Sequence, residues 1–371
     1  MFRAGGYGKR SDDGAKCKFV DLFCGGGGAS TGAKHAGYEV VLAVDSWPEG
    51  LEVHQMNHPE TTHMCLTLPP ENELPFPDHT EQWHLHGSPP CTRVSVANQE
   101  RDPDERVKAI ELVKWYIELA TNSTATSWTM EQVATPIVLE CLEDFKCHCN
   151  SSRFDYEVFD FYDLGVPQHR RRVIAGSADV VSRLRRINTW HRNASDVIPH
   201  PRGSHIRNYM RKSNPKPDPE GKVKWVYKYY SDDEACKPLS GASPVVIAGQ
   251  LLRWATPYTK TNFVLFTPSE MALLQCFPED YILHNNTRIS MRCVGNALPP
   301  IIMFQALAGR KPHNHLKRRY VNANPASPCF NRNIHRIGIA PLARTDKAES
   351  LLVGGGADEV VEDVTKSPQL A

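Results

Sequence analysis

The chain has 371 residues, of which 40% are hydrophobic and 23% are charged, and its formal net charge is +1. This length can bury a large core and suggests two or three domains, and the composition excludes a disordered or fibrous chain. No apolar run approaches the roughly 18 residues of a membrane span, and the first residues lack the apolar core of a secretion signal. We expect an intracellular protein, located in the nucleus of a eukaryote or of a virus-infected nucleated host, and in the cytoplasm of a bacterium.

The first elements alternate between strand and helix. Residues 19–23 form a short apolar run, glycines occupy 25–28, and a helical stretch follows that Gly37 ends. Residues 39–45 form a second apolar strand, and Pro48 begins another helix. This order predicts the opening of an α/β fold with a doubly wound, mostly parallel sheet.

The next strand leads into a proline-rich turn. Residues 62–66 suggest a short strand, and residues 83–86 suggest a buried strand that runs into Ser88-Pro89-Pro90-Cys91. Two consecutive prolines fix φ and restrict the residue before each of them, so the backbone that leads to Cys91 has little freedom. A thiol held in this way is well placed for nucleophilic attack, although the same pattern fits a simple proline-rich connection.

A helix and three strands are expected between residues 102 and 175. Asp102-Pro103-Asp104-Glu105 is a strong helix start. One apolar face then predicts a helix to about Ala120, formed by Val107, Ile110, Val113 and Ile117. Residues 127–130 form a strand that ends at Glu131, which we expect to meet Cys91 at the carboxyl edge of the sheet. Strands at 156–161 and 172–175 flank a loop at 165–168.

After Ala178 the regular alternation of elements stops. Residues 186–265 are rich in proline, arginine and aromatic residues and suggest a small separate domain of strands and loops. Residues 183–228 contain twelve lysines and arginines against three acids, which fits a polyanionic partner or a solvated face. Helices are expected at 267–275 and 301–308.

The glycine turn favours an adenosine-bearing cofactor. Glycines between a strand and a helix let a ligand approach the backbone closely. Asp45 ends the second strand, where an acidic residue often binds ribose hydroxyls, and Trp47 could cover an adenine face. The glycine spacing differs from Gly-x-Gly-x-x-Gly and no phosphate-binding lysine follows, which weakens the nicotinamide and nucleoside-triphosphate alternatives. A turn that is merely tight is the remaining alternative.

Metal binding is not expected. Eleven cysteines are scattered without the spacing of a disulfide framework, and reduced thiols are the default without an export signal. The group Cys141, Cys147, His148 and Cys149 lacks the second half of a zinc-binding pattern.

Several blocks of the sequence together resemble the cytosine-C5 DNA methyltransferases. In order, the blocks are Asp21-Leu22-Phe23-Cys24-Gly25-Gly26-Gly27, Pro89-Pro90-Cys91, Glu131-Gln132-Val133, Gln168-x-Arg170-x-Arg172 and Gly295-Asn296-Ala297-Leu298-Pro299-Pro300. Residues 267–270 and 277–278 are similar to the penultimate block of that family. The resemblance covers residues 19–310, and it implies a Rossmann-like methyltransferase sheet, S-adenosyl-L-methionine as cofactor and double-stranded DNA as partner.

The resemblance also implies the chemistry. The thiolate of Cys91 would add to C6 of a cytosine flipped out of the duplex, so that C5 can accept the methyl group. Glu131 would hold N3 and the exocyclic amine, and Arg172 would bind O2. Arg170 and Gln168 would orient the loop and a backbone phosphate. Ser95 is a further substrate-binding residue, and the implied cofactor residues are Asp21, Phe23, Gly25, Gly27, Asp45, Trp47, Pro89, Asn296 and Ala297.

The resemblance further implies a division of the chain. Residues 19–185 would be the catalytic and cofactor-binding domain, 186–265 the target-recognition region for a short DNA site, and 266–311 the last blocks that return to the catalytic domain. Residues 1–18 would be a leader and 312–371 a flexible tail, in a protein that we expect to be a monomer.

The chain departs from the family pattern at four positions. Thr92 follows the cysteine where glutamine is usual, Val94 replaces phenylalanine, and Gln132 replaces asparagine. Cys65 stands where a carboxylate often faces the adenine amine. A tRNA cytosine-C5 methyltransferase of the same family and a catalytically silent DNA-binding relative remain alternatives.

Overall fold

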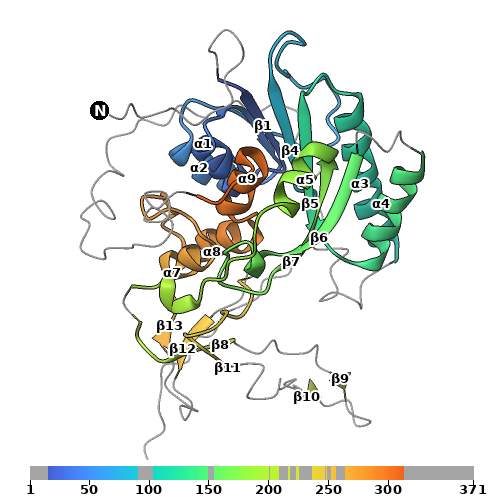
Figure 1. Cartoon of the computed structure of the whole chain (residues 1–371). Helices are drawn as coiled ribbons and strands as arrows, with labels where there is room; N and C mark the ends of the chain where they lie inside the picture. The colour runs from blue at the N-terminus through green and yellow to red at the C-terminus, as the bar shows by residue number, and fades with distance from the viewer. Residues whose placement is uncertain are drawn as a thin grey trace, which may run out of the picture.

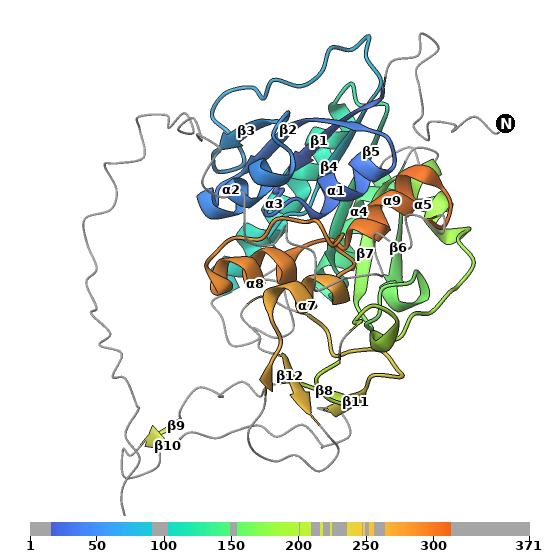
Figure 2. The same ribbon diagram turned by 90° about the vertical axis from the view of Figure 1, so that its left-hand side faces the viewer.

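The computed structural model describes residues 16–90, 103–148, 154–199, 201–208, 216–217, 223–224, 236–246, 248, 252–255 and 264–312. Figures 1 and 2 show the arrangement of these segments. The predicted nucleophile Cys91 and the predicted substrate residue Ser95 lie outside the described residues. Most of the predicted leader and all but the first residue of the predicted tail lie outside them too.

The centre of the molecule is a seven-stranded sheet with the order β3-β2-β1-β4-β5-β7-β6. Five strands are parallel, and β7 runs antiparallel to both β5 and β6. The predicted doubly wound, mostly parallel α/β sheet is therefore confirmed. The strands are β1 Lys18–Leu22, β2 Glu39–Asp45, β3 Thr62–Cys65, β4 Trp83–Gly87, β5 Ser127–Val133, β6 Phe154–Asp160 and β7 Arg171–Ser177.

Helices cover both faces of this sheet (Figure 1). Side chains alternate along β1, so that Phe19 packs with α1, α5 and α9 while Val20 and Leu22 pack with α3 and α4. None of the helices in the described part of the chain is long and apolar enough to cross a membrane. The helices are α1 Gly28–His35, α2 Pro48–Asn57, α3 Pro103–Asn122, α4 Pro136–His148, α5 Ala178–Arg185, α7 Pro268–Leu274, α8 Thr287–Asn296 and α9 Pro300–Ala308.

Local sequence signals explain several helix ends. Pro48, Pro268 and Pro300 each stand in the first turn of a helix, where the missing N–H costs nothing. Thr267 and Glu270 form a capping box at the start of α7, in which the Thr267 hydroxyl accepts from the Glu270 N–H at 3.2 Å. Gly309 ends α9 with a left-handed φ of 65°.

Three expectations about elements were wrong or incomplete. Val107 is 54% exposed, because it lies in the first turns of α3 before the buried face begins at Ala109. Glu131 does not end its strand, because pairing with β7 extends β5 to Val133. Helices α4, α5 and α8 were not predicted; α5 was hidden by its arginines, although Val180, Val181 and Leu184 form a buried stripe.

A second, antiparallel sheet with the order β11-β8-β12-β13 lies beyond α7 and α8 in both views (Figures 1 and 2). Ile206 and Leu252 of this sheet, together with Leu239 directly after β11, share a core with α7 and α8 residues and with Val53 of α2. Residues on both sides of the predicted boundary at 265/266 thus pack together, and the division into domains stays a prediction. The strands are β8 His205–Asn208, β11 Cys236–Pro238, β12 Leu252–Ala255 and β13 Val264–Leu265, and a separate pair is formed by β9 Lys216–Pro217 and β10 Val223–Lys224.

Candidate active site

The predicted site residues gather at the carboxyl edge of the parallel strands. Because β1, β4 and β5 are parallel and Gly87 pairs with both Leu22 and Met130, Glu131 stands one step beyond the end of β4. The turn that precedes Cys91 starts at this level. In open α/β sheets this edge is where ligands bind.

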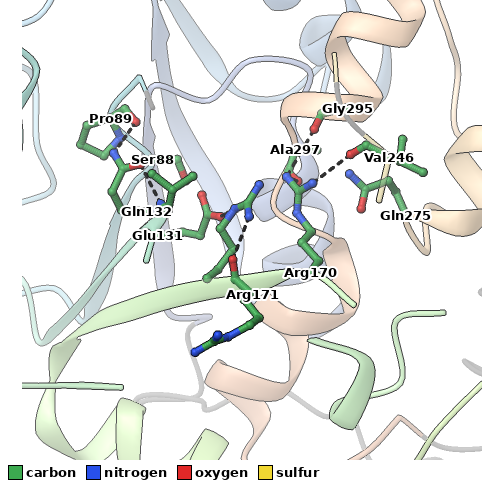
Figure 3. A network of polar contacts seen from close by, with 12 residues as sticks. Ser88, Pro89, Glu131, Gln132, Arg170, Arg171, Val246, Gln275, Gly295 and Ala297 are labelled. Carbon is green, nitrogen blue, oxygen red and sulfur yellow. Dashed lines mark hydrogen bonds and ion pairs between the residues drawn. The ribbon is translucent and has the colours of Figure 1, made fainter. Parts of the chain in front are cut away.

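The turn Ser88-Pro89-Pro90 is fixed by hydrogen bonds to both neighbouring strands. The Ser88 N–H donates to the Leu22 carbonyl at 3.2 Å, and the Gln132 side-chain amide donates to the Pro89 carbonyl at 3.0 Å (Figure 3). The Gln132 side-chain oxygen accepts from the Val133 N–H at 2.8 Å. The backbone that leads to Cys91 is therefore held from both sides.

Glu131 and Arg172 form a largely buried ion pair on adjacent strands. Arg172 Nε lies 2.9 Å from Glu131 Oε1, and the two side chains are 15% and 9% exposed. The Arg172 guanidinium also donates to the Arg171 carbonyl at 2.8 Å. Within the described residues Glu131 Oε1 has no hydrogen bond of regular geometry, and its polar contact is the ion pair with Arg172. The structure brings these two predicted catalytic residues together.

Arg170, which the resemblance includes among the catalytic residues as a group that orients the loop, contacts backbone carbonyls from two segments. Its side chain is 2% exposed. The guanidinium donates to the Val246 carbonyl at 2.9 Å and to the Gly295 and Ala297 carbonyls at 3.3 Å (Figure 3). Arg170 thereby ties the segment before β12 to the end of α8, and its role here is to position backbone.

Gln168 is also enclosed rather than open to a substrate. Its side chain is fully buried, and its amide group donates to the Leu274 carbonyl at 2.9 Å and to the Gln275 side chain at 3.0 Å. Its oxygen accepts from the Val246 N–H at 2.9 Å. In this arrangement Gln168 connects segments of the scaffold, and its contact with a substrate stays a prediction.

The glycine turn fits a closely approaching ligand. Gly25 has a left-handed φ of 49°, and a Cβ built there would meet no atom within 4 Å, so the backbone is open on that side. The Gly25 N–H donates to Asp45 Oδ2 at 2.8 Å, and the Trp47 N–H donates to Asp45 Oδ1 at 2.8 Å. Burial raises the pKa of Asp45, and these N–H groups and nearby Arg292 oppose that rise. The half-buried Asp45 carboxylate has further lone pairs that can accept hydrogen bonds from hydroxyl groups.

Trp47 follows Asp45 by two residues, and Cys65 is its neighbour on the adjacent strand β3. The Arg292 guanidinium lies 4.0 Å above the centre of the Trp47 ring. Cys65 is the partner of Asp45 in the pairing of β2 with β3, so it reaches the same edge. Asn296 is exposed at the end of α8. Adenosine contacts by these residues stay predictions, and their positions are compatible with them.

The conformation of the glycine turn depends on three further residues, which are Asp21, Phe23 and Gly27. Asp21 is buried and accepts from the Ser30 hydroxyl at 2.6 Å, and burial raises the pKa of Asp21 to about 7. Phe23 has a φ of 58°, which is unusual and strained for a bulky residue. Gly27 precedes α1 with a φ of 85°. Observed strain of this kind is typical of a ligand-binding turn.

Sequence reasoning missed the parts that hold the site together. Gln132 was noted only as a departure from a family pattern, yet it anchors Pro89. Arg292 of α8, 245 positions further along the chain, stacks on Trp47. Gln275 accepts from the Gln168 amide and donates to the Val294 carbonyl at 2.8 Å. Only Gln132 carried a local signal, because it follows Glu131 directly.

The chain is similar in sequence to proteins of a known family. The sequence profile of a family described as C-5 cytosine-specific DNA methylase matches residues 17–251 and 249–309. The chain is 26% identical over 327 residues to the type II methyltransferase M1.HphI of Haemophilus parahaemolyticus, covering 78% of this chain and 85% of that relative. It is 30% identical over 175 residues to the type II methyltransferase M.AgeI of Thalassovita gelatinovora, covering 44% of this chain and 40% of that relative.

One solved structure shows the same fold. A prophage-encoded protein of E. coli, described as a DNA modification methyltransferase, superposes with a TM-score of 0.52 at 19% identity. The match covers 79% of this chain and 98% of that chain. At this identity the likeness concerns the fold alone.

Proposed function

The chain belongs to the family of C-5 cytosine-specific DNA methylases, and from this premise we propose that it methylates duplex DNA through a covalent Cys91 adduct on a flipped-out cytosine. It is a DNA cytosine-5-methyltransferase that uses S-adenosyl-L-methionine as its methyl donor. The observation that carries the proposal is the buried Glu131–Arg172 pair beside the turn that precedes Cys91. An intracellular location and a monomeric state are parts of the same proposal.

The first step is nucleophilic addition. Cytosine C5 is too weak a nucleophile to take a methyl group unaided, so the Cys91 thiolate forms a bond to C6 and the C5=C6 electron pair becomes available at C5. Glu131 shares a proton with N3 and accepts a hydrogen bond from the exocyclic amine, and Arg172 donates to O2, where negative charge develops. The ion pair between them keeps both side chains in place before the base arrives.

The second half of the reaction restores the aromatic ring. Once C5 carries the methyl group, a base removes the C5 proton, the electron pair of the C5–H bond re-forms C5=C6, and the Cys91 thiolate leaves. Cytosine C6 cannot be reached inside the helical stack, so the base must first rotate out of the duplex. The basic and aromatic residues of 186–265 would bind the surrounding DNA.

Residues at the neighbouring strand ends would hold the cofactor. The Asp45 carboxylate is oriented by the Gly25 and Trp47 N–H groups to accept from ribose hydroxyls, and Trp47 lies next to it for an adenine ring. When bound, S-adenosyl-L-methionine supplies the methyl group as an electrophile. Pro89, Asn296 and Ala297 complete the proposed set, and Pro89 belongs to the same anchored turn.

A mechanism-based adduct tests this function. Fluorine at C5 cannot leave as a proton does, so DNA with 5-fluorocytosine at target sites should trap Cys91 as a covalent complex in the presence of S-adenosyl-L-methionine. Target sites would first be mapped by bisulfite sequencing of DNA from cells that express the chain. We expect a shifted, denaturant-resistant band with the wild type and none with Cys91→Ala.

The control separates chemistry from folding. Cys141→Ala removes a buried thiol on α4 that is outside the proposed set of site residues, and this variant should still form the adduct. Absence of the adduct with wild type that methylates the same sites would contradict the covalent mechanism. Methyl transfer confined to tRNA would contradict the proposed substrate.

A further inference from the structure

A hydrogen-bonded network of polar side chains, buried at its centre and half-buried at both ends, runs along β4 and β5 toward the turn that precedes Cys91. It contains the rings of His84 and His86 and the hydroxyls of Ser127, Thr129 and Ser88. His84 lies 2.8 Å from the Ser127 hydroxyl and 2.9 Å from that of Thr129. His86 lies 2.9 Å from the same Thr129 hydroxyl and 3.0 Å from the Ser88 hydroxyl. One hydroxyl therefore links two imidazoles.

A polar network of this kind is unusual on a central strand of a parallel sheet. Strand β4 is central and buried on both faces, where near-continuous apolar residues are the rule. His84, His86 and Thr129 are each at most 1% exposed. Buried polar groups lower stability unless they are bonded, whereas a connected network fixes one arrangement of side chains. We therefore expect this network to orient side chains rather than to stabilise the fold.

The Ser88 hydroxyl has a partner whichever way the hydrogens lie. Burial lowers the pKa of His86 to about 3, so its ring is neutral at physiological pH and carries one hydrogen. With that hydrogen on Nε2, the ring donates to Ser88; with it on Nδ1, Ser88 donates to Nε2. The contact between them persists in both tautomers.

Ser88 begins the anchored turn. Its N–H is bound to the Leu22 carbonyl, and the next residue, Pro89, is bound by Gln132 (Figure 3). Gly87 packs against the Tyr116 ring so closely that a Cβ there would overlap it. The backbone is therefore fixed on two sides, and the His86–Ser88 contact adds a third attachment through a side chain.

We propose that His86 is a positioning residue for methyl transfer: backed by Thr129 and His84, it holds the Ser88 hydroxyl and thereby sets the direction in which Pro89-Pro90 presents Cys91. The inference rests on the proposed role of Cys91 as nucleophile. It assigns a purpose to two histidines and a threonine that the reaction itself does not use.

Thr129 offers the sharpest test because both histidines contact its hydroxyl. Thr129→Val keeps the shape of the side chain and removes the shared hydroxyl, whereas Thr129→Ser keeps the hydroxyl. We expect the single-turnover methylation rate of Thr129→Val to fall roughly tenfold to a hundredfold, with Kd for DNA and for S-adenosyl-L-methionine within about twofold of wild type. Thr129→Ser should recover the rate to within about threefold.

Thr61→Val is the matched control. Thr61 is also buried, and its hydroxyl donates to the Val40 carbonyl at 2.8 Å, away from the Ser88 turn. The same substitution there should lower the melting temperature and leave the single-turnover rate near that of wild type. An equal loss of rate in Thr61→Val and Thr129→Val would mean that the effect is general destabilisation, and would overturn the inference.

Ser88→Ala tests the positioning role of His86 if Thr129→Val does not fold. Ser88 is only half-buried, and the substitution removes one hydroxyl at the end of the hydrogen-bonded network. Adduct formation with 5-fluorocytosine DNA should slow by a similar factor in Ser88→Ala. An adduct rate equal to that of wild type would overturn the positioning role while leaving the covalent mechanism intact. Absence of any adduct with wild type would instead contradict the proposed function.

Discussion

Gln132 illustrates how one side chain couples the two halves of the catalytic edge. It follows Glu131 on β5, is 1% exposed, and donates to the Pro89 carbonyl at 3.0 Å while accepting from the Val133 N–H. Glu131 and the turn before Cys91 are thus joined through a single amide group. A residue that differs from the usual family pattern retains the hydrogen-bonding groups that such a link needs.

Replacing Gln132 by leucine should therefore affect activity more than stability. Gln132→Leu leaves the Pro89 carbonyl and the Val133 N–H without their partner, which should cost about 1–3 kcal/mol of unfolding free energy. With the turn released, we expect the single-turnover rate to fall roughly tenfold or more. Urea denaturation and rapid-quench methylation at 20 °C below the melting temperature would measure the two effects separately.

Gln305→Leu is the matched control for that change. Gln305 is fully buried in α9, and its amide donates to the Leu164 carbonyl at 3.0 Å on the face of the sheet that α1, α5 and α9 cover. It should lose a comparable amount of stability and keep its methylation rate. If Gln132→Leu also kept its rate, the link to Pro89 would be structural only.

At the scale of elements, the sequence predicts best where the signal is local. The apolar run at β1, the glycines and the end of α1 at His35, shortly before Gly37, lie within about twenty residues, so periodicity and turn chemistry suffice to place them. Glu131 was placed at a strand end because the antiparallel partner β7 lies forty residues further on. The arginines of α5 gave that helix the composition of a loop region, although its buried stripe packs against α9 and β6.

The contact between α1 and the end of α8 sets the shape of the cofactor turn. A Cβ at Gly28 would collide with the Leu298 carbonyl oxygen and would lie 2.9 Å from Ala297 Cβ. Backbone cannot move aside as a flexible side chain can, so α1 must shift. Gly28→Ala should lower the melting temperature by several degrees and weaken binding of S-adenosyl-L-methionine at least about tenfold by calorimetry.

Gly25→Ala provides the comparison within the same turn. A Cβ there meets open space, so its cost is the left-handed φ of 49°, about 1 kcal/mol. Its melting temperature should fall less than that of Gly28→Ala. The reverse order would show that backbone conformation, rather than the contact with Leu298, limits the turn.

At the scale of the whole molecule, the scaffold of the site depends on contacts that no local pattern reveals. Gln168 and Arg170 both bind Val246, and through Gln275 and Gly295 they join the segment before β12 to α7 and α8. Their sequence block predicted that they belong to the site. Their burial could not be predicted, because the partners lie 76 to 125 positions away.

Buried histidines make the stability of the whole molecule depend on pH. Burial lowers the pKa of His58 and His86 to about 3 and lowers the pKa of His54 well below its usual value. Each of these groups binds a proton more readily in the unfolded chain, so the stability they contribute is present above pH 6.5 and is lost as pH falls. Asp21 acts in the opposite sense, because burial raises its pKa to about 7 and its contribution is lost as pH rises toward that value.

The net effect is a steep loss of stability in mild acid. The pKa is lowered at four histidines (His54, His58, His63 and His86) and raised at two aspartates (Asp21 and Asp45), so unfolding takes up more protons than it releases and the unfolding free energy should fall as the pH drops below 6.5. Urea titrations at pH 7.5, 6.5 and 5.5 would measure this slope. His58→Gln, which removes one titrating group, should reduce the slope by about 1.4 kcal/mol per pH unit. Stability that is constant or rises between pH 6.5 and 5.5 would show that these rings do not remain neutral in the folded protein.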